Sequence, residues 1–132
     1  MEPVNENAPV SKTMLWAGYV VTALPVLMLF FSAAMKFIKP AGFSEGMTLL
    51  GWPDHLAFTL GILELGCTII YLIPRTAVLG AILLTGYLGG ATATHVRIGD
   101  PSFIGAVIFG IMIWLGLYLR DARIRALIPL RS

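Results

Sequence analysis

Charged side chains are scarce in this sequence. Asp, Glu, Lys and Arg make up 12% of its 132 residues, compared with roughly 25% in soluble domains, whereas 58% of the residues are hydrophobic and the mean hydropathy is +0.86. The formal net charge is only +2, and the basic residues form no stripe of the kind that contacts nucleic acid. The composition indicates a membrane protein surrounded by the lipid bilayer, and no nucleic-acid partner is expected.

Cysteine and histidine are nearly absent as well. Cys67 is the one cysteine, so the chain forms no internal disulfide and has no Cys-x-x-Cys pair for thiol redox chemistry. The two histidines, His55 and His95, do not stand at the His-Glu-x-x-His or Glu-x-x-His spacing that would build a metal site with Glu64. We therefore expect no metal site and no haem, and we interpret Cys67 as a packing residue.

Four long apolar runs make up most of the sequence. They cover residues 14–37, 56–73, 77–95 and 103–119, and each is close to the ~20 residues that a helix needs to cross a bilayer. A transmembrane β-barrel would instead show alternating segments of about 10 residues, which this sequence lacks. The sequence predicts an all-α integral membrane four-helix bundle, residues 13–120, with spans at about 14–38, 55–73, 76–95 and 102–119.

The segments outside the spans are short. Residues 1–12 are polar, and we expect a disordered tail there. Because this segment is acidic and the run after it is long, the first span is expected to be retained rather than cleaved as a signal peptide. The connector 39–54 should lie in the interface as an amphipathic piece anchored by Trp52. Residues 121–132 form a basic tail predicted to rest on anionic lipid.

The basic residues are distributed by side of the membrane. One face carries Lys36, Lys39 and Arg97. The other face, which both termini share, carries Lys12, Arg75, Arg120, Arg123, Arg125 and Arg131. Positive residues accumulate on the cytoplasmic side of membrane proteins, so both termini are predicted to be cytoplasmic.

One acidic residue, Glu64, lies in the middle of the second apolar run. At 1.5 Å per residue it is roughly 13 Å from a helix start near His55, which is close to the bilayer midplane. A charged carboxylate facing lipid there would cost several kcal/mol, so Glu64 should face the bundle interior. The helical spacings of 3, 4 and 7 place it on one face with small and polar neighbours: Ala57, Gly61, Thr68 and Tyr71.

Candidate partners for Glu64 come from the first and third spans. Lys36 ends the first span one turn after Ser32, and His95 ends the third on the same outer side. Side chains tilt toward the N-terminus of their helix, which here is toward the membrane interior. A polar ligand cavity lined by Ser32, Lys36, Glu64, Tyr71, Tyr87 and His95 is therefore predicted. The alternatives are a snorkelling Lys36, a wetted His95 and a purely structural Glu64–Lys36 pair.

Small residues gather in the third span. Gly86 and Gly90 form a Gly-x-x-x-Gly pair, which lets helices approach closely where no hydrophobic effect drives them together. Together with Gly61 they are predicted to pack helices. These glycines also favour docking of a helix from a membrane partner. That partner is either another membrane protein or a second copy of this chain.

The run GILELGCTIIYLIPRTAVLGAILLTGYLGGATATH (61–95), preceded by Ser-x-x-x-Lys at the end of the first span, resembles the DoxX-like family of small four-helix membrane proteins. The resemblance covers residues 25–118. It rests on the Gly-x-x-Glu element at Gly61 and Glu64, the Leu-Ile-Pro-Arg turn and the small-residue run into Ala-Thr-His. In this chain the second glycine follows Glu64 by two positions rather than three.

The resemblance implies an accessory role in a bacterial cytoplasmic (inner) membrane. The family's namesake is a membrane subunit associated with thiosulfate:quinone oxidoreductase, others belong to redox complexes for thiol stress, and distant animal relatives are assembly chaperones. Because paired cysteines are lacking, autonomous catalysis is not expected. The first hypothesis is an accessory or anchor subunit that binds a lipophilic molecule such as a quinone beside Glu64. The alternative is an assembly module with a structural Glu64 pair, and a small-molecule carrier ranks third.

Overall fold

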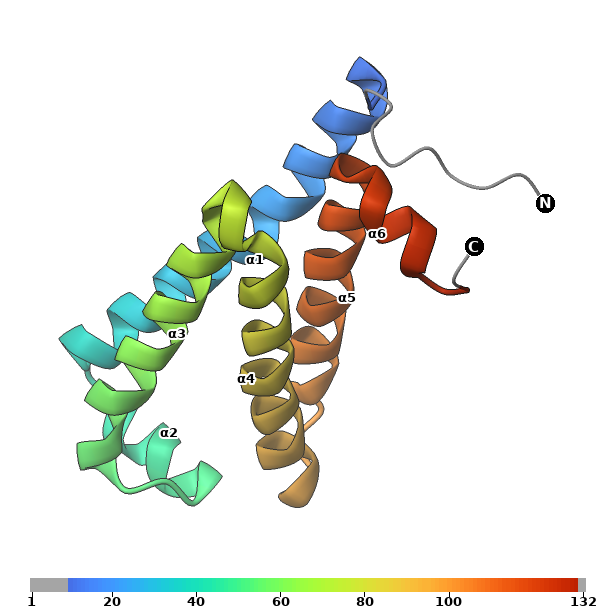
Figure 1. Ribbon diagram of the computed structural model, residues 1–132. Helices are drawn as coiled ribbons and strands as arrows, with labels where there is room; N and C mark the ends of the chain where they lie inside the picture. The colour runs from blue at the N-terminus through green and yellow to red at the C-terminus, as the bar shows by residue number, and fades with distance from the viewer. Residues whose placement is uncertain (1–9, 131–132) are drawn as a thin grey trace.

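The computed structural model describes residues 10–130, and every regular element among them is helical (Figure 1). Four long helices are apolar enough to cross a membrane, which confirms the all-α class and the four apolar helices of membrane-spanning length. They are α1 (Lys12–Ile38), α3 (Ala57–Leu72), α4 (Ala77–Arg97) and α5 (Phe103–Arg120). The short 3-10 helices η1 (Asp54–Leu56) and η2 (Pro74–Thr76) lead into α3 and α4. Most of the predicted disordered tail, residues 1–9, lies outside the described residues.

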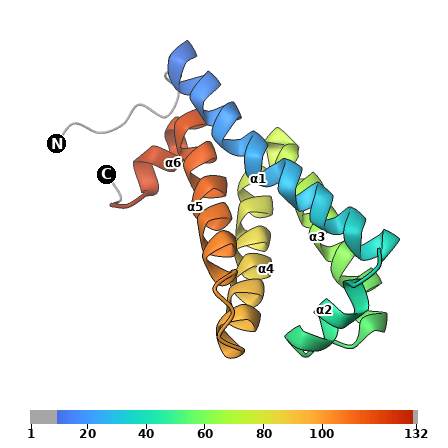
Figure 2. The same cartoon turned by 180° about the vertical axis from the view of Figure 1, so that it is seen from behind.

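The four long helices form a ring in which each packs against two neighbours. Helix α1 packs against α3 and α5, and α4 packs against the same two helices. One end of the molecule, which we call the termini end, contains the start of α1, η2 and the end of α5 (Figure 1). The opposite end, which we call the α2 end, contains α2 (Phe43–Leu50) and the α4–α5 turn. Seen from behind, α1 runs along α3, and its N-terminal half meets α5 beside α6 (Ala122–Leu127) (Figure 2).

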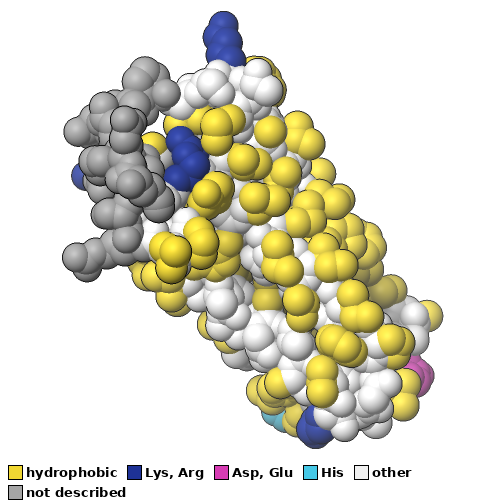
Figure 3. All heavy atoms as spheres, turned by 90° about the vertical axis from the view of Figure 1, so that its right-hand side faces the viewer, with side chains coloured by type: hydrophobic (Ala, Val, Ile, Leu, Met, Phe, Trp, Pro, Cys, Tyr) yellow, Lys and Arg dark blue, Asp and Glu magenta, His cyan; other side chains and the backbone are white. Residues whose placement is uncertain are grey.

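Apolar side chains occupy both the interior and the outer surface of the ring. Its buried core includes Val26, Leu29, Tyr71, Leu84 and Ile113. Large apolar side chains on the outside remain exposed, for example Trp16 at 68% and Val20 at 67%. Figure 3 shows these apolar side chains covering the surface between the two ends, while the Lys, Arg, Asp, Glu and His side chains in view lie at the ends. An apolar surface of this extent suits contact with lipid.

Glycines set the closest helix approaches. A Cβ at Gly80 of α4 would overlap the backbone of Tyr71 in α3. Where α1 crosses α5, a Cβ at Gly18 would lie 3.0 Å from the Gly116 carbonyl oxygen, and one at Gly116 would overlap Thr22 Oγ1. These crossings follow the rule that small residues let membrane helices pack backbone to backbone.

Both ends of the ring carry a short helix. The connector between α1 and α3 contains α2, a helix of 8 residues. The end of this connector, at Asp54, is held near the end of α1 by an ion pair, because Lys39 Nζ lies 3.6 Å from Asp54 Oδ2. At the other end Asp121 caps α6 by accepting a hydrogen bond from the Arg123 amide at 2.9 Å. The carboxylate of Asp121 also pairs with the Arg123 guanidinium at 3.1 Å, so the basic segment after α5 begins as a folded turn.

Candidate functional site

The inward face of α3 is the one that the helical spacing predicts. Its buried residues are Ala57, Gly61, Glu64, Thr68 and Tyr71. Glu64 is 2% exposed and Thr68 is fully buried. The Thr68 hydroxyl donates to the Glu64 backbone carbonyl at 2.7 Å, so it needs no partner from another helix. The Glu64 carboxylate is therefore the ionisable group that α3 presents to the bundle interior.

Lys36 and Ser32 of α1 meet Glu64 inside the bundle. Lys36 Nζ donates to Glu64 Oε1 at 3.2 Å and to Ser32 Oγ at 2.7 Å. The exposed fractions of the Lys36 and Glu64 side chains are 16% and 3%. The inward tilt of helical side chains explains how a lysine near the end of α1 reaches a carboxylate deep in α3.

Gly61 allows α1 and α3 to come close enough for this ion pair. A Cβ at Gly61 would lie 2.9 Å from the Phe37 ring and 3.3 Å from Lys36 Cβ. The Phe37 ring packs edge-on against Phe58, with ring centroids 5.4 Å apart. The close approach at Gly61 and the aromatic contact therefore hold α1 and α3 together beside the Glu64–Lys36 pair.

Tyr87 of α4 completes the cluster. Its side chain lies close enough to the Glu64 carboxylate to interact with it, as does the side chain of Ser32. The structure thus brings together four of the six predicted site residues: Ser32, Lys36, Glu64 and Tyr87. We call these four residues the Glu64 cluster. It offers one carboxylate acceptor, one ammonium donor and two hydroxyls in a setting with little water, where such groups interact strongly.

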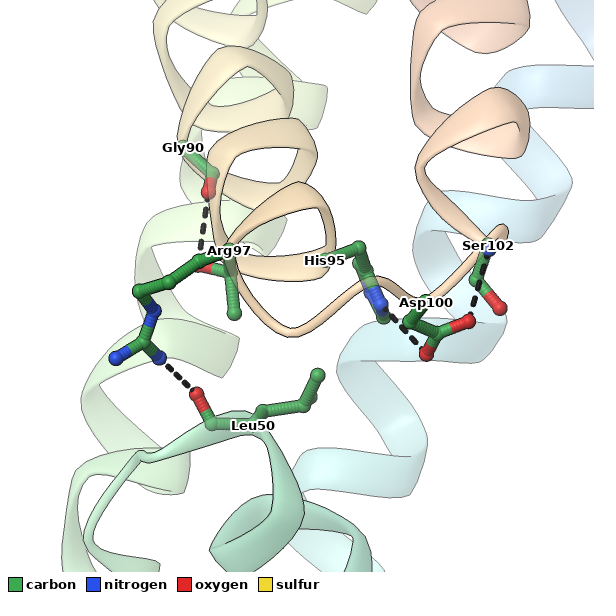
Figure 4. Close-up of polar contacts among 7 residues, drawn as sticks. Leu50, Gly90, His95, Arg97, Asp100 and Ser102 are labelled. Atoms are coloured by element: carbon green, nitrogen blue, oxygen red, sulfur yellow. Dashed lines mark hydrogen bonds and ion pairs between the residues drawn. The ribbon is translucent and has the colours of Figure 1, made fainter.

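His95 has a different partner. Its Nδ1 lies 3.0 Å from Asp100 Oδ2 (Figure 4). His95 is not among the groups that act on the Glu64 carboxylate. The chain reverses at Gly99, where φ is +72°, and the Asp100 amide donates to the His95 carbonyl at 3.0 Å. Hydrogen bonds from the backbone and side chain of Ser102, then from His95, lower the pKa of the Asp100 carboxyl. The His95 side chain, from the last turn of α4, therefore contacts the α4–α5 turn instead of Glu64.

Arg97 joins the end of α4 to the end of α2. Its Nη2 donates to the Leu50 carbonyl, as Figure 4 shows, and a cation there suits the negative end of the α2 dipole. Gly51 follows with φ +82°, and a Cβ on it would lie 2.6 Å from Arg97 Nη2. A hollow of about 300 Å³ lies beside this contact, lined by Gly51, Trp52, Ala93, Thr94 and Arg97. Sequence reasoning missed the Arg97 contact, because no spacing rule relates the ends of two helices 47 positions apart.

Tyr71, the sixth predicted site residue, belongs to a second polar cluster nearer the termini end. Its hydroxyl donates to the Ile113 carbonyl at 2.7 Å and accepts from Arg120 Nη2 at 3.2 Å. The Arg120 guanidinium lies over the rings of Tyr71 and Tyr19, at 5.6 and 5.7 Å from their centroids. A guanidinium held on two aromatic faces is stabilised by cation–π attraction. Tyr71 therefore ties α3 to α5 rather than facing Glu64.

The glycines predicted to pack helices fall into two groups. Gly61 packs α3 against α1, whereas the Cα atoms of Gly86 and Gly90 face open space within the chain. Of the three glycines at the closest crossings, Gly116 was expected from the sequence to pack the fourth span, whereas Gly18 and Gly80 were missed. Gly18 and Gly80 lie in no Gly-x-x-x-Gly pair, so their sequence signal is weak.

Comparison with known proteins identifies the family but no close relative. Neither the curated proteins nor the solved structures contain a match to this chain. Residues 20–117 match the DoxX-like family, a stretch of 98 of the 132 residues that extends from α1 to the end of α5 and includes the whole Glu64 cluster. The chain therefore belongs to the DoxX-like family of proteins.

Proposed function

We propose that this protein is an accessory or anchor subunit of a quinone-linked membrane redox system, and that the Glu64 cluster binds the polar head of a lipophilic molecule. The observation that carries the proposal is the Glu64–Lys36 ion pair at 3.2 Å, buried within helices that cross the membrane. Ionisable residues within membrane spans are costly, and they commonly mark ligand or proton sites.

The donors and acceptors of the cluster suit a quinone. The two carbonyls of a quinone accept hydrogen bonds, which the Lys36 ammonium and the hydroxyl of Tyr87 can donate. The reduced form has two hydroxyls, and the Glu64 carboxylate can accept from one of them. Because Lys36 is 16% exposed at its side chain, the cluster is more open on the side of α1 than around Glu64. His95 is left out of the proposed site, since its partner is Asp100.

The proposed membrane orientation follows from the basic residues. Among residues 10–130, the termini end carries five lysines and arginines and the α2 end carries three. By the positive-inside rule both termini lie in the cytoplasm of a bacterial cell, with the protein in its cytoplasmic membrane. The α2 end then faces outward, and α2 with its Arg97 contact covers part of that face.

Glu64→Gln tests the proposed ligand site. Losing a hydrogen bond to a charged group costs about 1.5–3 kcal/mol, so binding of a short-tailed benzoquinone should weaken roughly tenfold or more. The measurement is equilibrium binding to the purified protein in detergent micelles, with helical content checked by circular dichroism. Glu45→Gln on the exposed surface of α2 removes the same charge elsewhere and is the matched control. Unchanged affinity in a folded Glu64→Gln variant would refute the site.

A second candidate function is an assembly module for other membrane proteins. The open space at Gly86 and Gly90 favours it, because a Gly-x-x-x-Gly face without a neighbour in its own chain can accept a helix of a partner. In this case Gly90→Leu should abolish co-purification of a cross-linked membrane partner, and Glu64→Gln should leave it intact. Gly66→Leu, at an equally open position of α3, is the control. Retained co-purification with Gly90→Leu would exclude this face.

A further inference from the structure

A groove of about 550 Å³ runs along the outer surface between α4 and α5. Its lining residues include Gly89, Ala106, Gly110, Trp114, Tyr118 and Ile128. Its two threonines are occupied, because Thr85 donates to the Ala81 carbonyl at 2.7 Å and Thr92 donates to the Leu88 carbonyl at 2.8 Å. The α4–α5 groove thus offers mainly apolar surface, which suits a hydrocarbon chain better than a polar molecule.

The length of the α4–α5 groove matches one leaflet of a bilayer. Ala106 and Tyr118 both line it and are 12 positions apart on α5, which corresponds to about 18 Å at 1.5 Å per residue. One leaflet contributes about 15 Å to the hydrocarbon core. An acyl chain that enters from the termini end could therefore lie in the groove along most of its length.

The walls of the α4–α5 groove are shaped for a chain rather than for a helix. Trp114 Nε1 donates to Thr85 Oγ1 at 2.7 Å, so this indole is fixed across the groove wall, with Tyr118 one turn further along. Gly89 and Gly110 form the shallow floor between such bulky residues. Close helix docking needs a continuous small-residue stripe, which these aromatic side chains interrupt.

A basic side chain lies beside the groove near the termini end. Arg125 of α6 donates from Nη1 to the carbonyls of Tyr118 and Leu119, at 2.6 and 3.3 Å. Because Tyr118 lines the groove, the guanidinium lies near the part of the groove that Tyr118 and Ile128 line. The nearby carboxylate of Asp121 is engaged by Arg123 at 3.1 Å. The remaining N–H groups of Arg125 can donate to an anion, and the guanidinium fork fits phosphate oxygens.

We propose that the α4–α5 groove binds one acyl chain of an anionic phospholipid from the leaflet at the termini end, with the lipid phosphate at Arg125. The site is separate from the Glu64 cluster, and the proposal does not depend on the proposed function. Basic residues beside a membrane surface each add about 1 kcal/mol of attraction to anionic lipid, which corresponds to about a fivefold preference.

The test uses native mass spectrometry of the full-length protein in detergent with phosphatidylglycerol or phosphatidylcholine of identical acyl chains. The wild-type protein should bind phosphatidylglycerol about fivefold more tightly, and Arg125→Gln should remove this preference. Arg75→Gln, a charge removal in η2 at the same end, should keep it. Equal binding of the two lipids, or displacement of phosphatidylglycerol by inorganic phosphate, would overturn the proposal.

Filling the α4–α5 groove gives an independent measurement. Gly89→Leu should weaken both lipids about tenfold, because the new side chain occupies the space of the acyl chain. Gly86→Leu is the matched control, since Gly86 lies on the same helix at an equally open position but does not line the groove. Gly110→Leu fills the groove from α5 and should act like Gly89→Leu. A wild-type dimer that Gly89→Leu dissociates would assign the groove to a second copy and overturn the lipid proposal.

Discussion

Lys36→Met should lower the free energy of unfolding by about 3 kcal/mol, because removing one partner of a buried ion pair leaves the other charge uncompensated. Glu64 would lose the ammonium at 3.2 Å, and its side chain is only 3% exposed, so water cannot replace the lost contact. The shift is measured as the change in unfolding midpoint and slope during titration of detergent-solubilised protein with sodium dodecyl sulfate.

Two further variants test whether the loss of stability arises from the burial of the Glu64–Lys36 pair. Lys39→Met removes a lysine whose carboxylate partner, Asp54, is 46% exposed, and this change should cost at most about 1 kcal/mol. The double variant Lys36→Met/Glu64→Leu replaces the whole pair with apolar side chains and should recover most of the lost stability. If Lys36→Met and Lys39→Met had equal effects, the Glu64–Lys36 pair would make no special contribution to the fold.

Gly80→Ala should destabilise the protein by about 3 kcal/mol, the upper part of the usual range for overpacking. The added Cβ would overlap Tyr71 backbone atoms, which cannot rotate away as a flexible side chain could. Helices α3 and α4 must therefore separate locally, and the Tyr71 hydroxyl bond to the Ile113 carbonyl would be weakened with them.

Thermal unfolding followed by circular dichroism checks this expectation. Gly86→Ala adds the same methyl group to the same helix, but its Cβ would meet no atom within 4 Å. It should be neutral or slightly stabilising, because alanine is the better helix former by up to about 1 kcal/mol. A Gly80→Ala variant as stable as Gly86→Ala would contradict the close α3–α4 contact.

The spans and the inward face of α3 could be predicted because both depend on local patterns. Apolar length defines a span, and a period of 3.6 residues places Gly61, Glu64 and Thr68 on one face. The Lys36 contact was also within reach of sequence reasoning, since a mid-span carboxylate requires a partner and the side-chain tilt limits the choice.

The partners of His95 and Tyr71 could not be predicted in the same way. His95 binds Asp100 because the backbone reverses at Gly99 with a positive φ, and the path of such a turn determines which side chain returns. Tyr71 meets Arg120, 49 positions away, because α3 and α5 present residues to the same interior region. Likewise, a glycine spacing shows that a close approach is possible but not which helix lies opposite.

The sequence separation of Lys36 and Glu64 has a consequence for biosynthesis. Lys36 precedes Glu64 by 28 positions, so α1 leaves the ribosome, and can enter the bilayer, before the carboxylate of α3 is available beside it. In that interval Lys36 must extend to the interfacial water, as long basic side chains near helix ends do. Once α3 inserts, the ammonium can turn inward to Glu64. The ion pair therefore makes the final position of the first span dependent on the arrival of the second.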